Sequence, residues 1–320
     1  VNEIRKNHTT NRLEFLTDSS LLFDYCILMF LLGNDFIPHL DMISTDMYSI
    51  KMLLKSYKIT AHQVQSNLFQ KRECMLNVTF LRKLFLYLGK YEDSKIEKKR
   101  EYYYRKRLRV PDTVTTPEQE AVWKMNSFPM QIRNQQQDRL LGNQHWRATY
   151  YSHYFGIPYD NKDEIKTICD EYWKAIVWTT HYYFHNGTPS WEWFYPYRRG
   201  PTIRDLTTYF METINTFKFD TQTCYPPYEQ LLMVLPSRSK SLLPKSYQSL
   251  FDSITSELLP YYPETFQLDT DYHQWFHECI PHLPIIPRSL LERVVKPLYE
   301  KLTSEEQIRN EFEDDYQVTA

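Results

Sequence analysis

The chain has 320 residues, of which 42% are hydrophobic and 24% charged, so it can bury a core in one large or two moderate domains. Its formal net charge of −2 gives no overall electrostatic argument for nucleic-acid binding, so any such case depends on local basic patches. It has only six glycines, and neither a GxGxxG nor a GxxxxGK motif occurs, which disfavours nucleotide binding by a glycine-rich loop.

Cellular location and completeness can also be judged from the sequence. The five cysteines are scattered, with no CxxC pair, which fits a reducing, intracellular compartment and disfavours a zinc site. The longest apolar run, from Leu21 to Leu32, is too short to cross a membrane, and no signal peptide opens the chain. We therefore expect no membrane partner. Because the first residue is Val1, we expect a fragment or a processed piece.

The first clear element is a buried helix over residues 18–32, with "DSS" as its N-cap and Gly33 at its end. Gly33 permits a left-handed backbone, and Pro38 prevents the helix from resuming, so Asn34 and Asp35 lie on a tight turn. A carboxylate fixed in this way suits a hard cation such as Mg²⁺. A turn stabilised by Asn and Asp bonding their own backbone is commoner, and spacing alone favours it.

Asp24 interrupts the apolar helix about three turns before Asp35. An ionised carboxylate in such a helix needs a partner. It could support a metal ligand from behind or pair with a buried base, and the sequence leaves both interpretations open.

Helical patterns follow over residues 44–57 and 76–88, and the second leads into a basic run, "KIEKKREYYYRKRLR", over residues 95–109. Cations and stackable rings alternate there, as in proteins that hold single-stranded nucleic acid. A solvated helix face is the commoner origin of such a run. The candidate RNA contacts within it are Lys98, Lys99, Arg100, Arg105, Lys106 and Arg107.

The rest of the chain predicts a mainly α-helical fold with little β structure. Residues 111–137 are rich in Pro, Thr, Gln and Asn and are predicted to form a linker between a region at 1–110 and a helical region at 138–320. Helical periodicity returns over 138–155 and 161–185. Short helical patterns separated by prolines then continue to the end.

The segment "HNGTPSWEWFYPYRRGP" is predicted to be an irregular aromatic loop. Trp191, Trp193 and Tyr197 stand in it beside Arg198 and Arg199. Exposed rings next to arginines suit stacking on an unpaired base and a grip on phosphate. A packed corner of the core is the other interpretation, and the pattern does not separate the two.

Several of these segments together resemble the Xrn/Rat family of 5′→3′ exoribonucleases. "FDYCILMFLLGNDFIPHL" is similar to a buried helix and GNDF(L/I)PH motif of that family, and "LNVTFLRKLFLYLGKYED" to its next helix. "EYWKAIVWTTHYYFHNGTPSWEWFYPYRRGPTIRDL", "YPPYEQLLMVLPSRSKSLLPKSY" and "HLPIIPRSLL" continue in the family's order. The likeness covers about residues 1–297, with 110–140 unmatched.

The resemblance implies the helical portion of an α/β PIN/FEN-like nuclease that degrades single-stranded RNA with a 5′ monophosphate. It implies that Asp35 is a catalytic metal ligand in a carboxylate cluster binding Mg²⁺ or Mn²⁺, with Asn34 and Asp24 behind it. It also implies that Trp191 or Trp193 stacks on bases near the 5′ end. The family's amino-terminal half, which supplies the other carboxylates, is absent from this chain, so the chain alone should not cleave RNA.

Some positions depart from the family pattern. The family's "YPYHYAP" is "YPYRRGP" here, which adds two positive charges beside the aromatic loop. Its Gly in E-G-L is Ala175, and its "LPFIDE" is "LPIIPR" with Pro287 and Arg288; these two changes indicate a distant member. A non-catalytic RNA-binding or scaffold protein derived from the later half of the family is the alternative function. We expect an intracellular location, cytoplasmic rather than nuclear.

Overall fold

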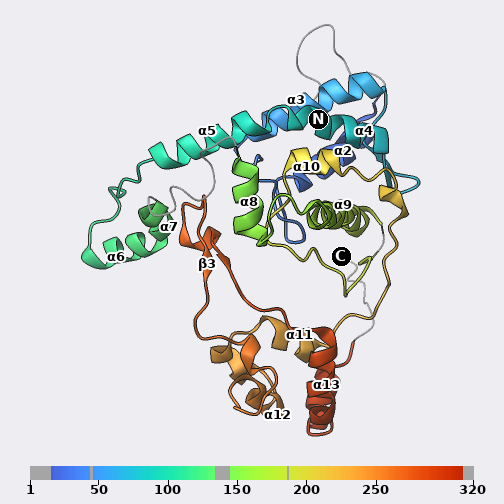
Figure 1. Cartoon of the computed structure of the whole chain (residues 1–320). Helices are drawn as coiled ribbons and strands as arrows, with labels where there is room; N and C mark the ends of the chain where they lie inside the picture. The colour runs from blue at the N-terminus through green and yellow to red at the C-terminus, as the bar shows by residue number, and fades with distance from the viewer. Residues whose placement is uncertain (1–15, 44–45, 134–144, 186, 313–320) are drawn as a thin grey trace, which may run out of the picture. The chain divides into compact units, whose positions relative to one another are not determined.

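The computed structural model describes residues 16–43, 46–133, 145–185 and 187–312. The chain forms two compact units, the first comprising Val1–Thr221 with Asp271–His277, and the second Gln222–Thr270 with Glu278–Ala320. The described part is mainly helical, as predicted, and its strands form only two short antiparallel hairpins (Figure 1). The division between units differs from the predicted boundaries at 110 and 138.

The first helix confirms the predicted buried element. Helix α2, Asp18–Phe30, starts at Thr17, whose hydroxyl accepts a hydrogen bond from the Ser20 backbone N–H, so the N-cap lies one residue before the predicted "DSS". After α2 ends, Gly33 adopts a φ of 88°. A side chain there would bring a Cβ to 2.8 Å from the His39 backbone nitrogen, so the turn requires glycine.

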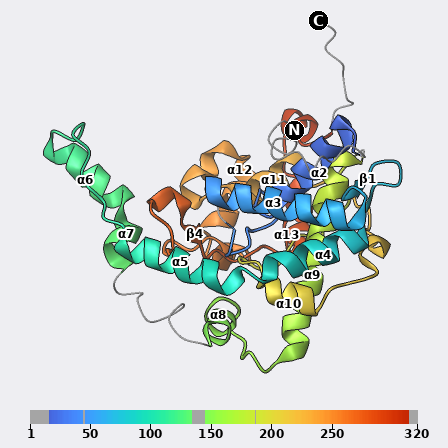
Figure 2. The same cartoon turned by 90° about the horizontal axis from the view of Figure 1, so that it is seen from above.

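Three further helices form one side of the first unit. They are α3 (Met47–Val64), α4 (Val78–Gly89) and α5 (Glu92–Arg105), with a hairpin of β1 (Phe69–Gln70) and β2 (Met75–Leu76) between α3 and α4. The predicted apolar stripe of α4 is buried: Phe80, Leu81, Leu84, Phe85 and Leu88. Helix α3 lies beside α4, and α5 continues from the end of α4 (Figure 2).

Two helices occur within the segment that was predicted as a linker. Helix α6, Pro117–Asn126, begins with a capping box between Thr116 and Gln119 and has no buried side chain. Helix α7, Phe128–Ile132, buries Met130 completely. The polar composition of the segment reflects the solvation of α6 rather than a lack of helix.

The remaining elements of the first unit surround its longest helix. Helix α8 is Trp146–Phe155, α9 is Lys162–Phe184 and α10 is Ile203–Thr208, followed by the 3₁₀ turn η2 at Ile214–Thr216. The predicted start of α8 near residue 138 lies outside the described residues. Buried α9 side chains join the core of the unit, and the largest are Tyr172 and Trp173.

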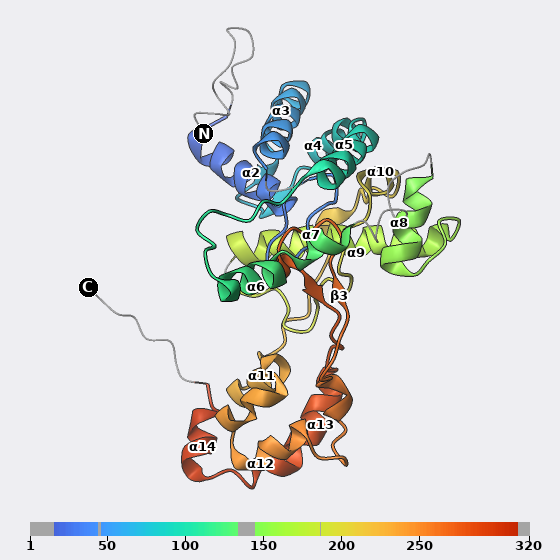
Figure 3. The same cartoon turned by 90° about the vertical axis from the view of Figure 1, so that its left-hand side faces the viewer.

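The second unit has its own core, built from short elements (Figure 3). Its helices are α11 (Pro227–Val234), α12 (Lys245–Gln248), α13 (Arg288–Tyr299) and α14 (Ser304–Arg309). Its hairpin pairs β3 (Leu268–Asp269) with β4 (Ile280–Pro281), and its 3₁₀ turns are Ser237–Leu242, Ser249–Phe251 and Leu259–Tyr261. Another 3₁₀ turn, Phe276–Glu278, begins in the segment that belongs to the first unit. None of the helices described for either unit is both long and apolar enough to cross a membrane.

Candidate functional site

The turn after α2 is fixed by the side chain of Asn34. Its Oδ1 accepts hydrogen bonds from the backbone N–H groups of Phe36, at 2.9 Å, and Ile37, at 3.1 Å. The Asn34 backbone N–H donates to the Ile37 carbonyl at 3.0 Å. The turn-stabilising interpretation is therefore confirmed for Asn34, whose side chain is occupied by its own loop.

The carboxylate of Asp35 is placed differently from its neighbour. Its side chain is exposed, and it makes no hydrogen bond or ion pair with any residue that the structure describes. Within those same ranges, no group of three His, Cys, Asp or Glu side chains could hold a metal ion. The described residues therefore fit a metal site only as the donor of one carboxylate, and its role as a ligand stays a prediction.

The turn that carries Asp35 is anchored to α9 on its other side. The Phe36 ring lies 4.9 Å from that of Trp178 and 4.5 Å from that of Tyr182, measured between centroids. The Tyr172 hydroxyl donates to the Pro38 carbonyl at 3.0 Å. Because rings and backbone are both held, the exposed carboxylate projects from a rigid base.

Asp24 is completely buried, and its partners are all hydrogen-bond donors. Its Oδ2 accepts from the Tyr57 hydroxyl at 2.6 Å and from the Leu68 N–H at 2.8 Å, and its Oδ1 accepts from the Phe69 N–H at 2.8 Å. Burial raises the pKa of Asp24 to about 6, partly opposed by these donors. Asp24 thus joins α2 to α3 and to β1. None of these donors is a basic side chain, so the structure does not show the predicted pairing of Asp24 with a buried base. The other interpretation, in which Asp24 supports a metal ligand from behind, stays a prediction.

Sequence reasoning missed a buried charge cluster around Asp41, directly after the GND turn. The Asp41 carboxylate accepts from the Tyr150 hydroxyl at 2.6 Å and lies 3.3 Å from Arg199 Nη1 and 3.4 Å from Lys99 Nζ. These cations hold its pKa well below the usual range despite burial. Its other neighbour, His39, lies 3.9 Å away, and burial lowers the pKa of His39 to about 4.

Two residues of this cluster were predicted to contact RNA, and the structure places both beside Asp41; Arg199 is buried, and the Lys99 side chain is 23% exposed. Arg199 is only 2% exposed, its guanidinium lies 4.6 Å from the Tyr154 ring centroid, and it donates to the Asp271 carbonyl at 3.3 Å. Lys99 donates to the Asp41 carbonyl at 2.9 Å, and burial lowers its pKa. The expectation of two exposed arginines in the loop is therefore corrected for Arg199. The clue in the sequence was the polar pair of His39 and Asp41 within an apolar stretch.

The two tryptophans of the aromatic loop, which the sequence could not distinguish, have different surroundings in the structure. Trp191 is 44% exposed and makes no ring contact with a described residue. Trp193 is partly buried: its Nε1 donates to Glu171 at 2.9 Å, and Lys174 Nζ lies 5.0 Å from its ring centroid. Both backbone N–H groups at 192 and 193 donate to Ser190 Oγ, which fixes the bend. Trp193 therefore anchors the loop, and Trp191 is presented on its surface.

The other predicted loop residues also differ in exposure. Tyr197 is partly buried, with its ring edge-on to those of Phe155, at 5.6 Å, and Tyr195, at 5.5 Å. Arg198 is exposed. Of the two arginines predicted to contact phosphate, Arg198 is exposed on the aromatic loop and Arg199 is buried.

The basic run forms α5 and the residues after it, and its cations have unlike surroundings. Lys98, Arg105 and Arg107 are exposed, and Arg105 lies 3.8 Å from Glu101, its neighbour one turn earlier. Lys106 donates to Gln274 Oε1 at 2.6 Å. Arg100 is partly buried. The run is therefore partly a solvated face and partly structural, and its RNA contacts remain predictions.

Comparison with known proteins identifies the family. The Xrn1 helical domain family matches residues 17–138 and 110–319. The chain belongs to the Xrn1 helical domain family. Similar proteins are 5′-3′ exoribonuclease 2 of Schizosaccharomyces pombe, 36% identical over 166 residues, and 5′-3′ exoribonuclease 1 of Homo sapiens, 27% identical over 338 residues. 5′-3′ exoribonuclease 1 of Saccharomyces cerevisiae is 30% identical over 170 residues.

The three alignments differ in how much of each protein they include. They cover 52%, 95% and 53% of this chain but only 16%, 19% and 11% of the respective relatives. This Xrn1 helical domain chain thus spans less than a fifth of the length of these exoribonucleases.

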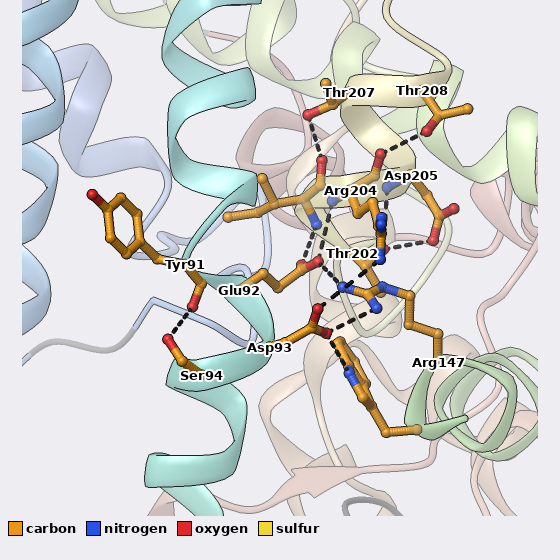
Figure 4. Close-up of polar contacts among 12 residues, drawn as sticks. Tyr91, Glu92, Asp93, Ser94, Arg147, Thr202, Arg204, Asp205, Thr207 and Thr208 are labelled. Atoms are coloured by element: carbon orange, nitrogen blue, oxygen red, sulfur yellow. Dashed lines mark hydrogen bonds and ion pairs between the residues drawn. The ribbon is translucent and has the colours of Figure 1, made fainter. Parts of the chain in front are cut away.

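A second polar network, which sequence reasoning did not predict, connects parts of the Xrn1 helical domain at the start of α5 (Figure 4). Glu92, 2% exposed, accepts from Arg147 Nη2 at 2.7 Å and from the Ile203 N–H at 2.5 Å. Asp93 lies 2.9 Å from Arg147 Nη1 and accepts from Trp146 Nε1 at 2.8 Å. The network connects the first turns of α5, α8 and α10, and Glu92 supplies an acceptor for the N-terminal N–H groups of α10.

Proposed function

We propose that this chain is part of a 5′→3′ exoribonuclease that hydrolyses single-stranded RNA with a 5′ monophosphate, processively and with a divalent metal ion. The support is its family and the names of its relatives, which are 5′-3′ exoribonucleases. The structural observation that supports the proposal is the position of Asp35. It is an exposed carboxylate that bonds to none of the residues described by the structure, on a turn held by Asn34 and α9.

Asp35 would contribute one carboxylate ligand to Mg²⁺ or Mn²⁺, and the remaining ligands would come from the family's amino-terminal nuclease half. Hard cations favour such oxygen ligands. When bound, the metal would activate the attacking water and neutralise charge on the leaving oxygen. Asn34 would act through the loop, because its two hydrogen bonds to Phe36 and Ile37 set the direction of the Asp35 side chain.

The aromatic loop would guide the RNA, with Trp191 as the stacking residue. Its ring is exposed, whereas that of Trp193 is tied to Glu171 and Lys174. An exposed indole can stack on any base, which suits degradation without regard to sequence. Arg198, exposed on the same loop, would contact phosphate.

We also place the site of action inside the cell, in the cytoplasm rather than the nucleus. The five cysteines, Cys26, Cys74, Cys169, Cys224 and Cys279, are all free, which suits a reducing compartment.

The test is RNA degradation by the enzyme reconstituted with the amino-terminal nuclease half. Asp35→Ala should abolish Mg²⁺-dependent release of nucleotides from 5′-monophosphorylated RNA and leave RNA binding within about twofold, because the loop does not depend on this side chain. Asp160→Ala is the matched control, since Asp160 is also an exposed aspartate on a turn of the first unit.

Two results would contradict the proposal. Normal turnover by Asp35→Ala would exclude a ligand role. Absence of any nuclease activity in the reconstituted wild type, combined with intact RNA binding, would favour the alternative of a non-catalytic RNA-binding or scaffold protein.

A further inference from the structure

A pocket of about 300 Å³ lies in the first unit, away from the residues assigned above to metal and loop functions. Helix α3 forms one wall, and the end of α4 with the first half of α5 forms the other. No Asp or Glu side chain lines it. Its volume is at the lower end of the range for small-molecule sites, so it would hold one compact group rather than an extended ligand.

The charge of the pocket is strongly one-sided. Two of its lysines are on α3 and two are on α5: Lys51, Lys55, Lys95 and Lys98. Three of these, Lys51, Lys55 and Lys98, are exposed and make no ion pair with a described residue. Four ammonium groups without carboxylates among them repel one another, and an anion between them would relieve that repulsion.

Lys95 is the inner lysine of the group and is held in place. Its Nζ lies 3.9 Å from the Tyr48 ring centroid and 3.4 Å from Ser49 Oγ. Burial lowers its pKa, and the neighbouring Lys98 acts in the same direction. Asp46 opposes this, but its carboxylate is engaged in capping α3, where it accepts from the Ser49 N–H at 2.9 Å.

Flat rings accompany the lysines. Tyr48 is 61% exposed and Tyr91 is 40% exposed, and the Tyr91 hydroxyl donates to that of Tyr87 at 3.2 Å. Tyr91 projects from the start of α5 away from the carboxylates of Glu92 and Asp93 (Figure 4). The two acids are thus turned from the pocket, and its rings offer faces on which a planar base can stack.

The walls of the pocket are set by the core beneath them. In α3, Tyr57 is buried with its ring 5.3 Å from that of Phe80 in α4. The Glu92–Arg147 network fixes the beginning of α5. The lysines and tyrosines therefore converge on a preformed space, and binding needs little rearrangement of the backbone.

We propose that this pocket is a nucleotide-binding site, in which the lysines hold a phosphate and a tyrosine stacks on the base. The nucleotide is either a free nucleoside monophosphate or one residue of an RNA strand, and both present the same chemistry. The site includes Lys98, a candidate RNA contact of the basic run, and adds the α3 lysines and the tyrosines, to which the nuclease function proposed above assigns no role.

The test is binding of adenosine 5′-monophosphate and of an oligoadenylate to the protein without divalent metal, so that no hydrolysis occurs. Isothermal titration calorimetry should show that Lys51→Glu/Lys55→Glu weakens binding at least tenfold. Tyr48→Ala should weaken it about tenfold, the loss expected from removing one stacked base. The matched control is Lys296→Glu/Lys301→Glu, which reverses two exposed lysines of the second unit. Circular dichroism spectra identical to the wild type establish that each variant is folded.

The two ligands distinguish the two sources. A selective loss of adenosine 5′-monophosphate binding in the α3 double variant supports the site and assigns it to free nucleotide. A selective loss of oligoadenylate binding alone supports the site and assigns it to the strand. If both ligands bind the α3 variant as they bind the wild type, or if the control loses as much affinity, the proposal is overturned whatever the nuclease assay shows.

Discussion

The substitution Asp41→Asn tests whether the buried cluster behind the GND turn holds the first unit together. Asparagine keeps the shape of the side chain and an acceptor for the Tyr150 hydroxyl, 2.6 Å away. It removes the negative charge that lies 3.3 Å from Arg199 and 3.4 Å from Lys99. The variant would therefore leave the buried Arg199 and the partly buried Lys99 without the carboxylate that lies between them.

The cost can be worked out from these distances. At an effective dielectric constant of 20, a unit charge at 3.3 or 3.4 Å gives about 5 kcal/mol of attraction for each pair. Part of this is offset because asparagine is easier to bury than a carboxylate and because Lys99, whose pKa burial already lowers, can lose its proton. The net loss should be about 3 to 5 kcal/mol, as for other buried ion pairs broken on one side.

Urea-induced unfolding at pH 7 measures this loss directly, because Asp41 is ionised there. The matched control is Glu212→Gln, which breaks an ion pair with Arg82 in the same unit. Those side chains are 58% and 57% exposed, so the control should cost less than about 1 kcal/mol. If Asp41→Asn costs no more than the control, the cluster does not stabilise the fold and the reasoning from burial is wrong.

Three further outcomes follow from the same structure. The pKa of Asp24 is about 6 in the folded protein and 3.8 in the unfolded chain, so its contribution to stability is present below about pH 4 and is lost as the pH rises through 6. The free energy of unfolding should therefore decline by about 3 kcal/mol over this range, and Asp24→Asn should remove that decline. An unchanged decline in the variant would refute the raised pKa. Gly33→Ala should lower the free energy of unfolding by at least about 2 kcal/mol, because backbone strain and a 2.8 Å contact combine there. Gly156→Ala, at a φ of 70° with open space around it, should lower it by about 1 kcal/mol in the same denaturation assay. Equal losses would count against the tight turn. Trp191→Ala should weaken RNA binding about tenfold without loss of thermal stability, and Trp193→Ala should lower the melting temperature; the reverse result would exchange their roles.

Patterns local in sequence predicted the parts of the fold that depend on local forces. The stripe from Phe80 to Leu88 gave α4, because a helix buries residues three and four apart. The glycine and proline around Asp35 gave the turn, since backbone sterics decide it. The polar segment 111–137 contains helix α6 because a capping box can start a helix without any apolar face.

Contacts between distant segments could not be predicted from the same patterns. Arg199 in the aromatic loop was interpreted as an RNA contact, but its partner Asp41 is 158 residues away in sequence. Glu92 meets Arg147 across 55 residues, and no local pattern in the sequence indicates that pairing. Only the folded arrangement separates a cation that balances a buried acid from one available to phosphate.

The central claim is that Asp35 is a metal ligand, and a change of ligand chemistry tests it most directly. In the reconstituted enzyme, Asp35→Cys replaces a hard oxygen with a soft thiolate, which binds Mg²⁺ poorly and Cd²⁺ well. The account predicts that this variant loses RNA hydrolysis in Mg²⁺ and regains part of it when Cd²⁺ is added, while Asp160→Cys stays active in Mg²⁺ alone. Hydrolysis by Asp35→Cys in Mg²⁺ at the wild-type rate would contradict it.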